Sequence, residues 1–339
     1  MSANDIAVSV IVPTLNEEAV IARCLSGLTG QSMPGEAFEV ILVDNGSRDR
    51  TVEIALEFQD RLRIRVLRRE GVPVSALRNL GAAEARGRFV AFLDADCVAP
   101  PDWLDQAMEP LSQPGCGVIG AHYTIPPDSS WLARAWYGGM RAERRGRVAY
   151  VPAGTMLASR ELFFKVGGFD ESIRTSEDCE FCQRASAAGF SVEGIPSLSV
   201  VHLGTPQSMA AFYRKQSWQG TDVHTVFLRD MRRSAHAKAT LFALYTLCSL
   251  AAVAVGVPAA LLWGNAAAAV WIAILALGGP LLMAARSAMR RKRWGLLAPL
   301  ALLYAVYGLA RGLCLLGLVS RRRAQPQAVG TVAQEPKAA

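Results

Sequence analysis

The stretch Phe89-Val90-Ala91-Phe92-Leu93-Asp94-Ala95-Asp96 decides the fold. Its apolar first part predicts a buried strand, and two carboxylates follow where that strand ends. At positions i and i+2 of an extended chain, Asp94 and Asp96 point to the same side and repel each other unless a cation neutralises them. We therefore expect Asp94 and Asp96 to bind Mg²⁺ or Mn²⁺, with a solvated acidic turn as the plain alternative.

Outward from this strand, apolar runs alternate with helix patterns. Strands are predicted at residues 8–12, 38–43, 64–67 and 89–93, and helices at 18–28, 49–61 and 75–85. Further along the chain we expect a helix at 130–145, a strand at 148–158 and a helical stretch at 208–233 that is broken near Gly220. This alternation predicts an α/β fold, with a mostly parallel sheet, right-handed crossovers and flanking helices. Ligands bind such sheets beyond the carboxyl ends of the strands, so the polar segments that follow the strands are the expected site.

Three further polar segments lie at such positions. Pro13-Thr14-Leu15-Asn16-Glu17-Glu18 follows the first strand; Pro13 is expected to end that strand, and the acidic residues also suit an ordinary helix start. Asp44 follows the second strand and could accept hydrogen bonds from a base or a ribose. Arg78, on the third helix, could contact a nucleotide or a phosphate, or could be a surface arginine.

Together these segments resemble the family 2 glycosyltransferases, which have the GT-A fold. The resemblance covers roughly residues 6–205 and is carried by Pro13–Glu17, Val43–Thr51, Arg78-Asn79, Leu93–Asp96, Val166–Asp170 and Glu177-Asp178. Asn45 stands where many relatives carry a second Asp. Gln216-Ser217-Trp218 only faintly matches the Gln-x-x-Arg-Trp segment of processive members, which argues against processive polymerisation.

The resemblance implies a metal-dependent, inverting hexosyltransferase that uses a nucleotide-sugar donor. Asp178 would be the general base, with Glu177 orienting it or the acceptor, and Asp94 and Asp96 would hold the metal and diphosphate. The residues implied to bind the donor are Pro13, Thr14, Asn16, Glu17, Asp44, Arg78 and Asp94. A reaction of this kind needs a stabilised leaving diphosphate and a base for the acceptor hydroxyl, and both sets of carboxylates are present.

Two residues on the acceptor side are weaker candidates. His202 follows an apolar run and could touch the diphosphate, although a lone histidine is more often structural. Trp218 could stack on the acceptor, although packing in the core or the membrane explains it equally well. The expected acceptor is a polyprenyl phosphate or lipid-linked saccharide, followed by a growing surface glycan, because the C-terminal part of the chain predicts a membrane anchor.

The membrane anchor is predicted from residues 239–285, which contain no charged residue. Ala239–Trp263 and Ala266–Ala285 are each long enough to cross a hydrocarbon core, and Gly264 and Asn265 form the turn between them. The net charge of +7 is concentrated in basic clusters that flank the apolar runs and are absent from the turn. The positive-inside rule then predicts a multi-pass protein of the cell inner membrane with a cytoplasmic catalytic domain.

A third apolar stretch, Leu296–Val319, is interrupted by Arg311. As a third span it would place the basic residues 321–323 outside, against the charge rule; a surface-lying segment avoids this conflict. Its length slightly favours a third span. The predicted domains are a catalytic domain at residues 1–205, an amphipathic connecting segment at 206–238, a membrane region at 239–320 and a disordered tail at 321–339.

Other classes of function fit less well. A nucleotidyltransferase would favour a glycine-rich basic loop after the first strand, which here is acidic. The chain lacks the Gly-x-Gly-x-x-Gly pattern of a NAD-dependent enzyme, and no basic stripe suggests a nucleic-acid partner. A catalytically inactive membrane scaffold with the same fold would be expected to lose its metal carboxylates or its base, which this chain keeps. The polar start Met1–Asp5 does not resemble a signal peptide.

Overall fold

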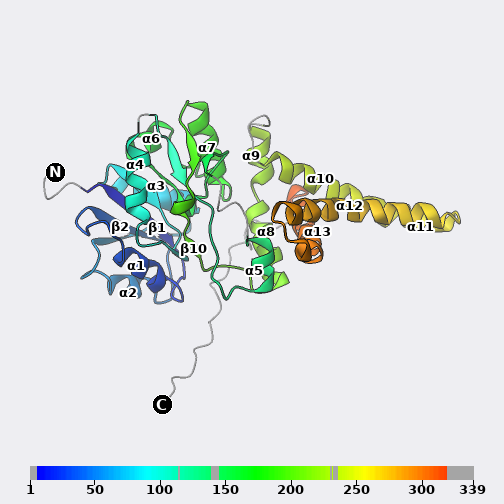
Figure 1. Ribbon diagram of the computed structural model, residues 1–339, viewed down its shortest axis with the longest axis horizontal. Helices are drawn as coiled ribbons and strands as arrows, with labels where there is room; N and C mark the ends of the chain where they lie inside the picture. Colours follow the sequence, from blue (N-terminus) through cyan, green and yellow to red (C-terminus); the bar gives the residue numbers. More distant parts are fainter. Residues whose placement is uncertain (1–5, 114, 139–144, 230, 232–235, 319–339) are drawn as a thin grey trace, which may run out of the picture. The chain divides into compact units, whose positions relative to one another are not determined.

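The computed structural model describes residues 6–113, 115–138, 145–229, 231 and 236–318. These residues form two compact units, which Figure 1 shows in the colours of the sequence. The first unit contains residues 6–126 and 145–204, and the second contains residues 127–138 and 205–318. Residues 127–138 therefore belong to the second unit, although they lie inside the segment expected to form the catalytic domain. The predicted domain boundaries stay a prediction.

The first unit is built around a sheet of eight strands. The strands of this unit are β1 (Val8–Thr14), β2 (Phe38–Asp44), β3 (Ile64–Arg68), β4 (Phe89–Phe92), β5 (Cys97–Val98), β6 (Val118–Gly120), β7 (Gly146–Arg147), β8 (Leu157–Ser159), β9 (Val192–Gly194) and β10 (Val201–His202). The order in the main sheet is β3-β2-β1-β4-β8-β6-β9-β7, and β5 pairs with β10 in a second, small sheet. β3, β2, β1 and β4 are mutually parallel, which confirms the predicted α/β fold with a mostly parallel sheet.

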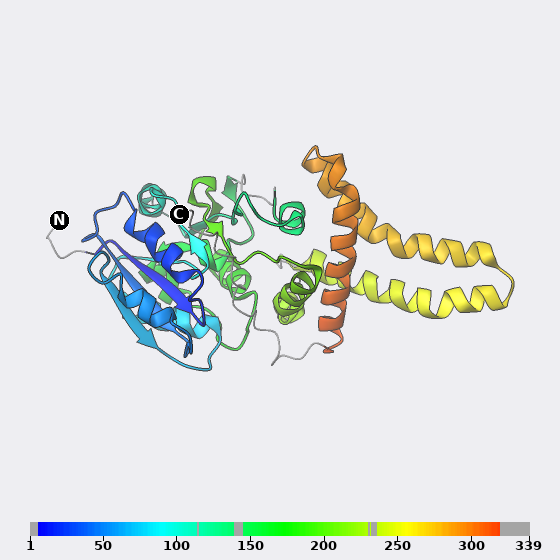
Figure 2. The same ribbon diagram turned by 90° about the horizontal axis from the view of Figure 1, so that it is seen from below.

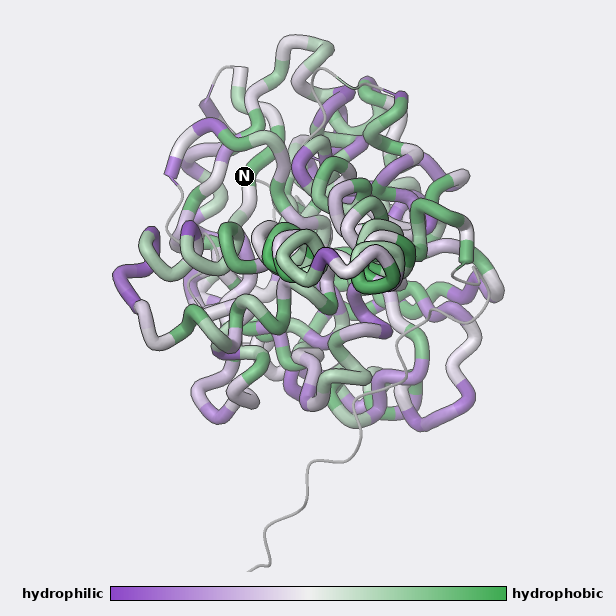
Figure 3. Tube along the Cα trace, turned by 90° about the vertical axis from the view of Figure 1, so that its right-hand side faces the viewer, coloured by the Kyte–Doolittle hydropathy of each residue, from purple (hydrophilic) through white to green (hydrophobic). Residues whose placement is uncertain are grey.

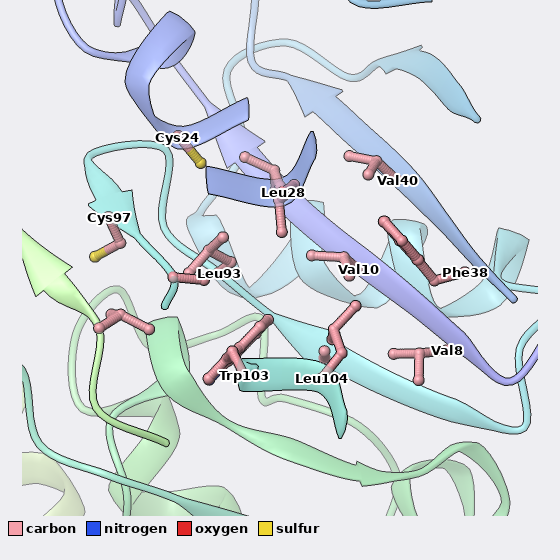
Figure 4. Close-up of a cluster of buried hydrophobic side chains, with 14 of the residues drawn as sticks. Val8, Val10, Cys24, Leu28, Phe38, Val40, Leu93, Cys97, Trp103 and Leu104 are labelled. Carbon is pink, nitrogen blue, oxygen red and sulfur yellow. The ribbon is translucent and has the colours of Figure 1, made fainter. Parts of the chain in front are cut away.

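Helices cover both faces of this sheet. The helices of the first unit are α1 (Ile21–Thr29), α2 (Thr51–Leu56), α3 (Val74–Glu84), α4 (Trp103–Ser112), α6 (Arg160–Lys165) and α7 (Glu177–Ala187), with short 3-10 turns η1 (Ala153–Thr155) and η2 (Pro196–Leu198). One buried cluster joins α1, α2 and α4 to the sheet, and Figure 4 shows part of it. A second cluster joins α3, α6 and α7 to the opposite face. The polar residues at the carboxyl ends of β1, β2 and β4, namely Thr14, Asp44 and Asp94, belong to neither cluster.

Two sequence expectations about local structure were wrong. Pro13 does not end the first strand: it lies inside β1 opposite Val43, and the strand ends at Thr14. Pairing of β1 with β4 stops at Ile11, so Pro13 has a neighbouring strand on one side only, where its missing N–H is tolerated. The strand expected at residues 148–158 is mostly irregular, because η1 interrupts it and leaves only β8.

The second unit consists of helices. They are α5 (Trp131–Trp136), α8 (Met209–Gly220), α9 (Val223–Arg229), α10 (Ala237–Ala251), a π turn η3 (Ala252–Gly256), α11 (Val257–Leu262), α12 (Ala266–Arg290), a 3-10 turn η4 (Trp294–Leu296) and α13 (Leu297–Leu315). The predicted break near Gly220 separates α8 from α9. The helix expected at residues 130–145 is α5 in its described part, and residues 139–144 lie outside the described residues, as does the predicted disordered tail.

Among the described residues, three helical segments are long and apolar enough to cross a membrane: Ala237–Leu262, Ala266–Arg290 and Trp294–Leu315. The first two form the predicted hairpin, with the turn at Gly264 and Asn265. Figure 3 looks along the hairpin and shows its mostly apolar residues. Figure 2 shows that α13 does not run alongside the hairpin but crosses its base, where α10 begins and α12 ends.

A side chain joins the two hairpin helices close to Pro280, which lies inside α12. The Tyr245 hydroxyl, from α10, donates a hydrogen bond to the Leu275 carbonyl and accepts one from the Gly279 N–H at 2.9 Å. Gly279 permits this approach, because a Cβ there would overlap the Tyr245 ring. Tyr245 therefore bridges a backbone donor and an acceptor of α12 that a regular helix would pair directly.

Candidate active site

Two carboxylates lie at the carboxyl end of β4, as predicted. Asp94, Asp96 and Cys97 can bring one ligand atom each within 4.8 Å of one another, and they are the one such group found among the described residues. Backbone closes around both carboxylates: a Cβ on Gly154 would overlap the Asp94 carboxylate, and a Cβ on Gly204 would overlap that of Asp96. Two hard oxygen donors held at short range are a suitable donor set for Mg²⁺ or Mn²⁺.

Arg78 connects this pair to the candidate base region. Its Nη2 lies 2.6 Å from Asp94 Oδ1, and its Nη1 lies 2.5 Å from Glu177 Oε1. The side chain is only 4% exposed, so both ion pairs are shielded from water. Burial by itself would raise the pKa of Asp94, but the Arg78 charge and hydrogen bond outweigh it and hold that pKa below its usual value. Arg78 thus keeps Asp94 ionised.

Tyr123 and His202 complete the surroundings of the carboxylates. The Tyr123 hydroxyl donates to Asp94 Oδ2 at 3.0 Å, and its ring meets the His202 ring edge-on at a centroid distance of 4.9 Å. His202 Nε2 lies 3.5 Å from Asp96 Oδ2, so the structure brings the predicted His202 to the carboxylate pair. Tyr123 was missed in the sequence analysis, because this residue comes shortly after the apolar strand β6 and no polar motif surrounds it.

Asp178 lies in the first turn of α7. Ser176, in the left-handed region with φ of 68°, redirects the chain so that Glu177 and Asp178 start the helix side by side. Glu177 faces Arg78, while Asp178 Oδ1 accepts the Cys179 N–H at 2.7 Å. Burial raises the pKa of Asp178 to about 7, and the Glu177 charge adds to this effect. Such a carboxylate can take up a proton near neutral pH.

The donor-side residues Thr14 and Asp44 lie opposite each other at the ends of β1 and β2. The buried Thr14 Oγ1 has no hydrogen-bond partner among the described residues, so it remains available to a ligand. Asp44 is engaged by its own loop: its carboxylate accepts hydrogen bonds from the Gly46 N–H at 3.0 Å and the Ser47 N–H at 3.1 Å. The two strand ends therefore form one polar edge, with Thr14 the more available group.

Asn16 and Glu17 differ in their surroundings. Asn16, with φ of 55°, joins the first two loops: its Oδ1 accepts the Arg48 N–H and its own N–H donates to Ser47 Oγ, both at 2.9 Å. This places Asn16 as a loop connector. Burial raises the pKa of Glu17 to about 8, and the charges of Asp96 and Asp94 raise it further. Glu17 therefore lies close enough to Asp94 and Asp96 for their negative charges to act on its carboxyl group.

The structure thus gathers most of the predicted residues at one edge of the sheet. Glu17, Arg78, Asp94, Asp96, Glu177, Asp178 and His202 are linked directly or through one neighbour. Pro13 is part of β1, and Trp218 lies on α8 in the second unit. The roles predicted for all of these residues stay predictions.

Two protein-family models match overlapping parts of the chain that include this edge of the sheet. Residues 89–307 match the model described as glycosyl transferase family group 2, and residues 9–166 match the model described as glycosyl transferase family 2. The chain is a family 2 glycosyltransferase. The matched segments of this family 2 glycosyltransferase include β1 from Ser9 onward, Asp94, Asp96 and the first part of α13.

Individual relatives agree with the family assignment. This family 2 glycosyltransferase is 32% identical over 202 residues to glycosyltransferase AglE of Haloferax volcanii, covering 55% of the chain and 63% of the relative. It is 35% identical over 133 residues to an undecaprenyl-phosphate 4-deoxy-4-formamido-L-arabinose transferase of Pseudomonas aeruginosa, covering 38% of each. The chain thus spans less than two thirds of the length of these relatives.

A solved structure extends the agreement to the fold. The mannosyltransferase PcManGT from Pyrobaculum calidifontis, solved in complex with GDP-Man and Mn²⁺, superposes with a TM-score of 0.65. The superposition covers 91% of this chain and 87% of PcManGT, at 21% sequence identity. The predicted GT-A-like fold, followed by apolar C-terminal helices, is therefore confirmed.

Proposed function

We propose that this chain is an inverting glycosyltransferase that moves a hexose from a nucleotide-sugar donor to a lipid-linked acceptor at the cytoplasmic face of the inner membrane. The observation that carries the proposal is the continuous chain of contacts from Asp96 to Glu177. His202 approaches Asp96, Tyr123 joins His202 to Asp94, and Arg78 joins Asp94 to Glu177, next to Asp178. A site for a diphosphate and a candidate base thus belong to one network.

Asp96 and Asp94 are the proposed residues for a divalent cation. When bound there, Mg²⁺ or Mn²⁺ would offset the charge of the leaving diphosphate. Arg78 and Tyr123 already occupy both oxygens of Asp94, whereas the contacts of the Asp96 carboxylate with His202, at 3.5 Å, and with the Cys97 thiol, at 3.7 Å, are longer. We therefore assign Asp96 the direct contact and Asp94 a supporting one. The Mn²⁺ bound by PcManGT supports this proposal.

Asp178 is the proposed general base. Its raised pKa, about 7, leaves the carboxylate basic enough to take the proton of an acceptor hydroxyl while remaining largely ionised in a mildly alkaline medium. Glu177 would orient it through the fixed contact with Arg78. Because one base and one displacement suffice, the proposed reaction inverts the anomeric centre, by analogy with inverting hydrolases.

The donor would lie along the ends of β1 and β2, where Thr14 Oγ1 lacks a partner and Asp44 ends the second strand. The nucleotide-sugar bound by PcManGT, GDP-Man, supports this class of donor. An acceptor carried by lipid is supported by the three apolar helices and by the undecaprenyl-phosphate named for the Pseudomonas relative. A growing glycan is the second proposed class of acceptor.

The proposed membrane topology has two spans. Three helices are long and apolar enough to span, and the crossing of α13 over the hairpin base is the reason to propose a surface-lying α13 instead of a third span. With two spans, the basic residues before α10, after α12 and at 321–323 all fall on the cytoplasmic side. The charge conflict of a three-span arrangement then disappears.

Transfer to lipid can be tested with membranes that contain the full chain and a panel of radiolabelled nucleotide-sugars. Label is expected to enter the organic-extractable fraction, and this incorporation should fall by about 10²-fold or more in Asp96→Asn or after chelation of divalent cations. Readdition of Mg²⁺ or Mn²⁺ should restore incorporation of label by the wild-type chain but not by the variant. The exposed Asp60→Asn is the matched control and should transfer normally.

Two results would count against this proposal. Label found only in water-soluble product would remove the lipid acceptor and leave the glycan alternative. Transfer that is unaffected by both the chelator and Asp96→Asn would remove the metal role, whatever the acceptor.

The rate of transfer should depend on pH through Asp178. Its pKa is raised above the ordinary value, so the protonated form prevails below about 7 and cannot act as a base. We expect kcat/KM to rise with pH through about 7 and then level off. The profile is measured at saturating metal, and a rate that is flat from about pH 5.5 to 8 would contradict the assignment.

A further inference from the structure

Arg311 is a buried cation within the second unit that the proposed chemistry does not use. It lies on α13 and is only 7% exposed. Its Nη2 donates to Gln216 Oε1 at 3.3 Å, a long hydrogen bond, while Nε and Nη1 have no hydrogen-bond partner among the described residues. A guanidinium buried with unmet donors is costly, so its presence indicates a ligand or an ion pair still to be made.

The surroundings of Arg311 offer further polar groups on the facing helix α8. The Ser217 hydroxyl is buried and also has no hydrogen-bond partner among the described residues. Gly220, one turn along α8, lets the guanidinium pack close to that helix: a Cβ there would come to 3.0 Å from Arg311 Nη1 and 2.8 Å from Cys314 Sγ. The Tyr307 ring lies under the guanidinium, 5.0 Å from its carbon. The α8 face thus presents the Gln216 amide oxygen, the Ser217 hydroxyl and a glycine to Arg311, and α8 carries no acidic side chain.

The internal alternative is pairing of Arg311 with Asp222. This buried carboxylate acts electrostatically on the same Cys314 thiol as Arg311 does. If Arg311 served only to balance Asp222, its loss would disturb folding without affecting any ligand. The test must therefore measure ligand binding directly.

The position of Arg311 in the unit selects the class of ligand. α13 crosses the base of the hairpin, close to the start of α10: the Arg311 carbonyl and Thr240 Oγ1 contact the two ring nitrogens of the same His224. If the hairpin crosses the membrane, the end of the hairpin where α10 begins and α12 ends lies at the level of the lipid headgroups. Phosphate is the common anion at that depth, and the planar fork of a guanidinium matches it.

We propose that Arg311, with Ser217, binds the phosphate group of a membrane lipid between α8 and α13. The two unpartnered guanidinium nitrogens would donate to phosphate oxygens once the Gln216 side chain gives up its long contact. If the phosphate belongs to the acceptor lipid, Arg311 fixes the acceptor chain at the headgroup level; this part rests on the proposed function. If it belongs to bulk phospholipid, Arg311 anchors α13 on the membrane surface.

Native mass spectrometry of the purified full chain in neutral detergent can test this site without any sugar transfer. The probes are undecaprenyl phosphate, undecaprenol and phosphatidylglycerol, each at the same mole fraction. The wild-type chain should retain undecaprenyl phosphate about tenfold better than undecaprenol, and Arg311→Gln should lose that preference. Arg290→Gln, the same change on the exposed end of α12, should keep it.

A second variant covers the case in which Arg311→Gln does not fold. Gly220→Ala keeps the charge and favours the helix, but its Cβ would crowd Nη1, so it should lower phosphate retention in the same direction. Equal retention of phosphatidylglycerol and undecaprenyl phosphate would support the site and assign it to bulk lipid. Preference for undecaprenyl phosphate would assign it to the acceptor.

The site would be overturned if folded Arg311→Gln and Gly220→Ala chains both kept the wild-type preference for phosphate. Failure of the proposed function would give a different result. Lipid binding is measured without a nucleotide-sugar donor, so it should persist in the Asp178→Asn chain. A chain that binds lipid phosphate through Arg311 but transfers no sugar would leave this inference standing and remove the proposed activity.

Discussion

Replacing Asp178 with Asn is expected to lower the rate of sugar transfer by about 10²- to 10⁴-fold, the range that general-base catalysis contributes. The amide has nearly the same shape but cannot take a proton from an acceptor hydroxyl. The Asp178 carboxylate accepts the Cys179 N–H at its Oδ1 atom, and an amide oxygen can keep that bond. The loss should therefore fall on kcat rather than on the fold.

Donor binding separates this outcome from a structural one. Nucleotide-sugar affinity, measured by calorimetry on the full chain in detergent, should change by less than about threefold in Asp178→Asn, because Asp178 is assigned to the acceptor side. Asp60→Asn serves again as the exposed control. A variant that transfers sugar at more than about a tenth of the wild-type rate would exclude Asp178 as the base.

Replacing Arg78 with Met should strongly destabilise the first unit. Arg78 is the shared partner of Asp94 and Glu177, and removing it leaves two carboxylates buried without their cation. Breaking a buried pair in this way costs about 3–5 kcal/mol. For a domain of this size the apparent Tm should fall by about 10 °C.

A matched control comes from the exposed pair of Arg50 and Glu53, whose side chains are 67% and 73% accessible. Arg50→Met should shift the Tm by no more than about 1–2 °C, because surface ion pairs contribute little. Both variants are compared by thermal melting of the full chain in detergent. Similar shifts in the two variants would mean that the Arg78 network does not hold the site together.

The sequence was sufficient to predict the part of the site that each strand carries locally. An apolar run followed by Asp94 and Asp96 identifies both a buried strand and its charged end, and the parallel sheet then brings Thr14 and Asp44 to the same edge. Contacts between distant segments could not be predicted in this way. Arg78 and Glu177 are 99 residues apart, and the packing of α3 and α7 on one face of the sheet is what joins them.

Tyr123 and α13 illustrate two further limits. Nothing local distinguishes Tyr123 from a core aromatic, and its role near Asp94 follows only from the pairing of residue Thr124 with Val201. The apolar composition of α13 predicts equally a helix across the membrane and one along its surface, since both bury apolar side chains. The packing of α13 against α8 and across the start of the hairpin, which the sequence does not show, is what supports the proposed surface-lying arrangement.

The contact of Tyr245 with α12 bears on how this protein enters the bilayer. Hydrocarbon offers no water to satisfy the carbonyl and amide beside Pro280, so α12 inserted alone would carry exposed polar backbone. The phenol supplied by α10 removes that penalty only when both helices are present. We expect the two segments to cross as a pair, so that a chain lacking Ala237–Leu262 would leave α12 without its companion and prone to degradation.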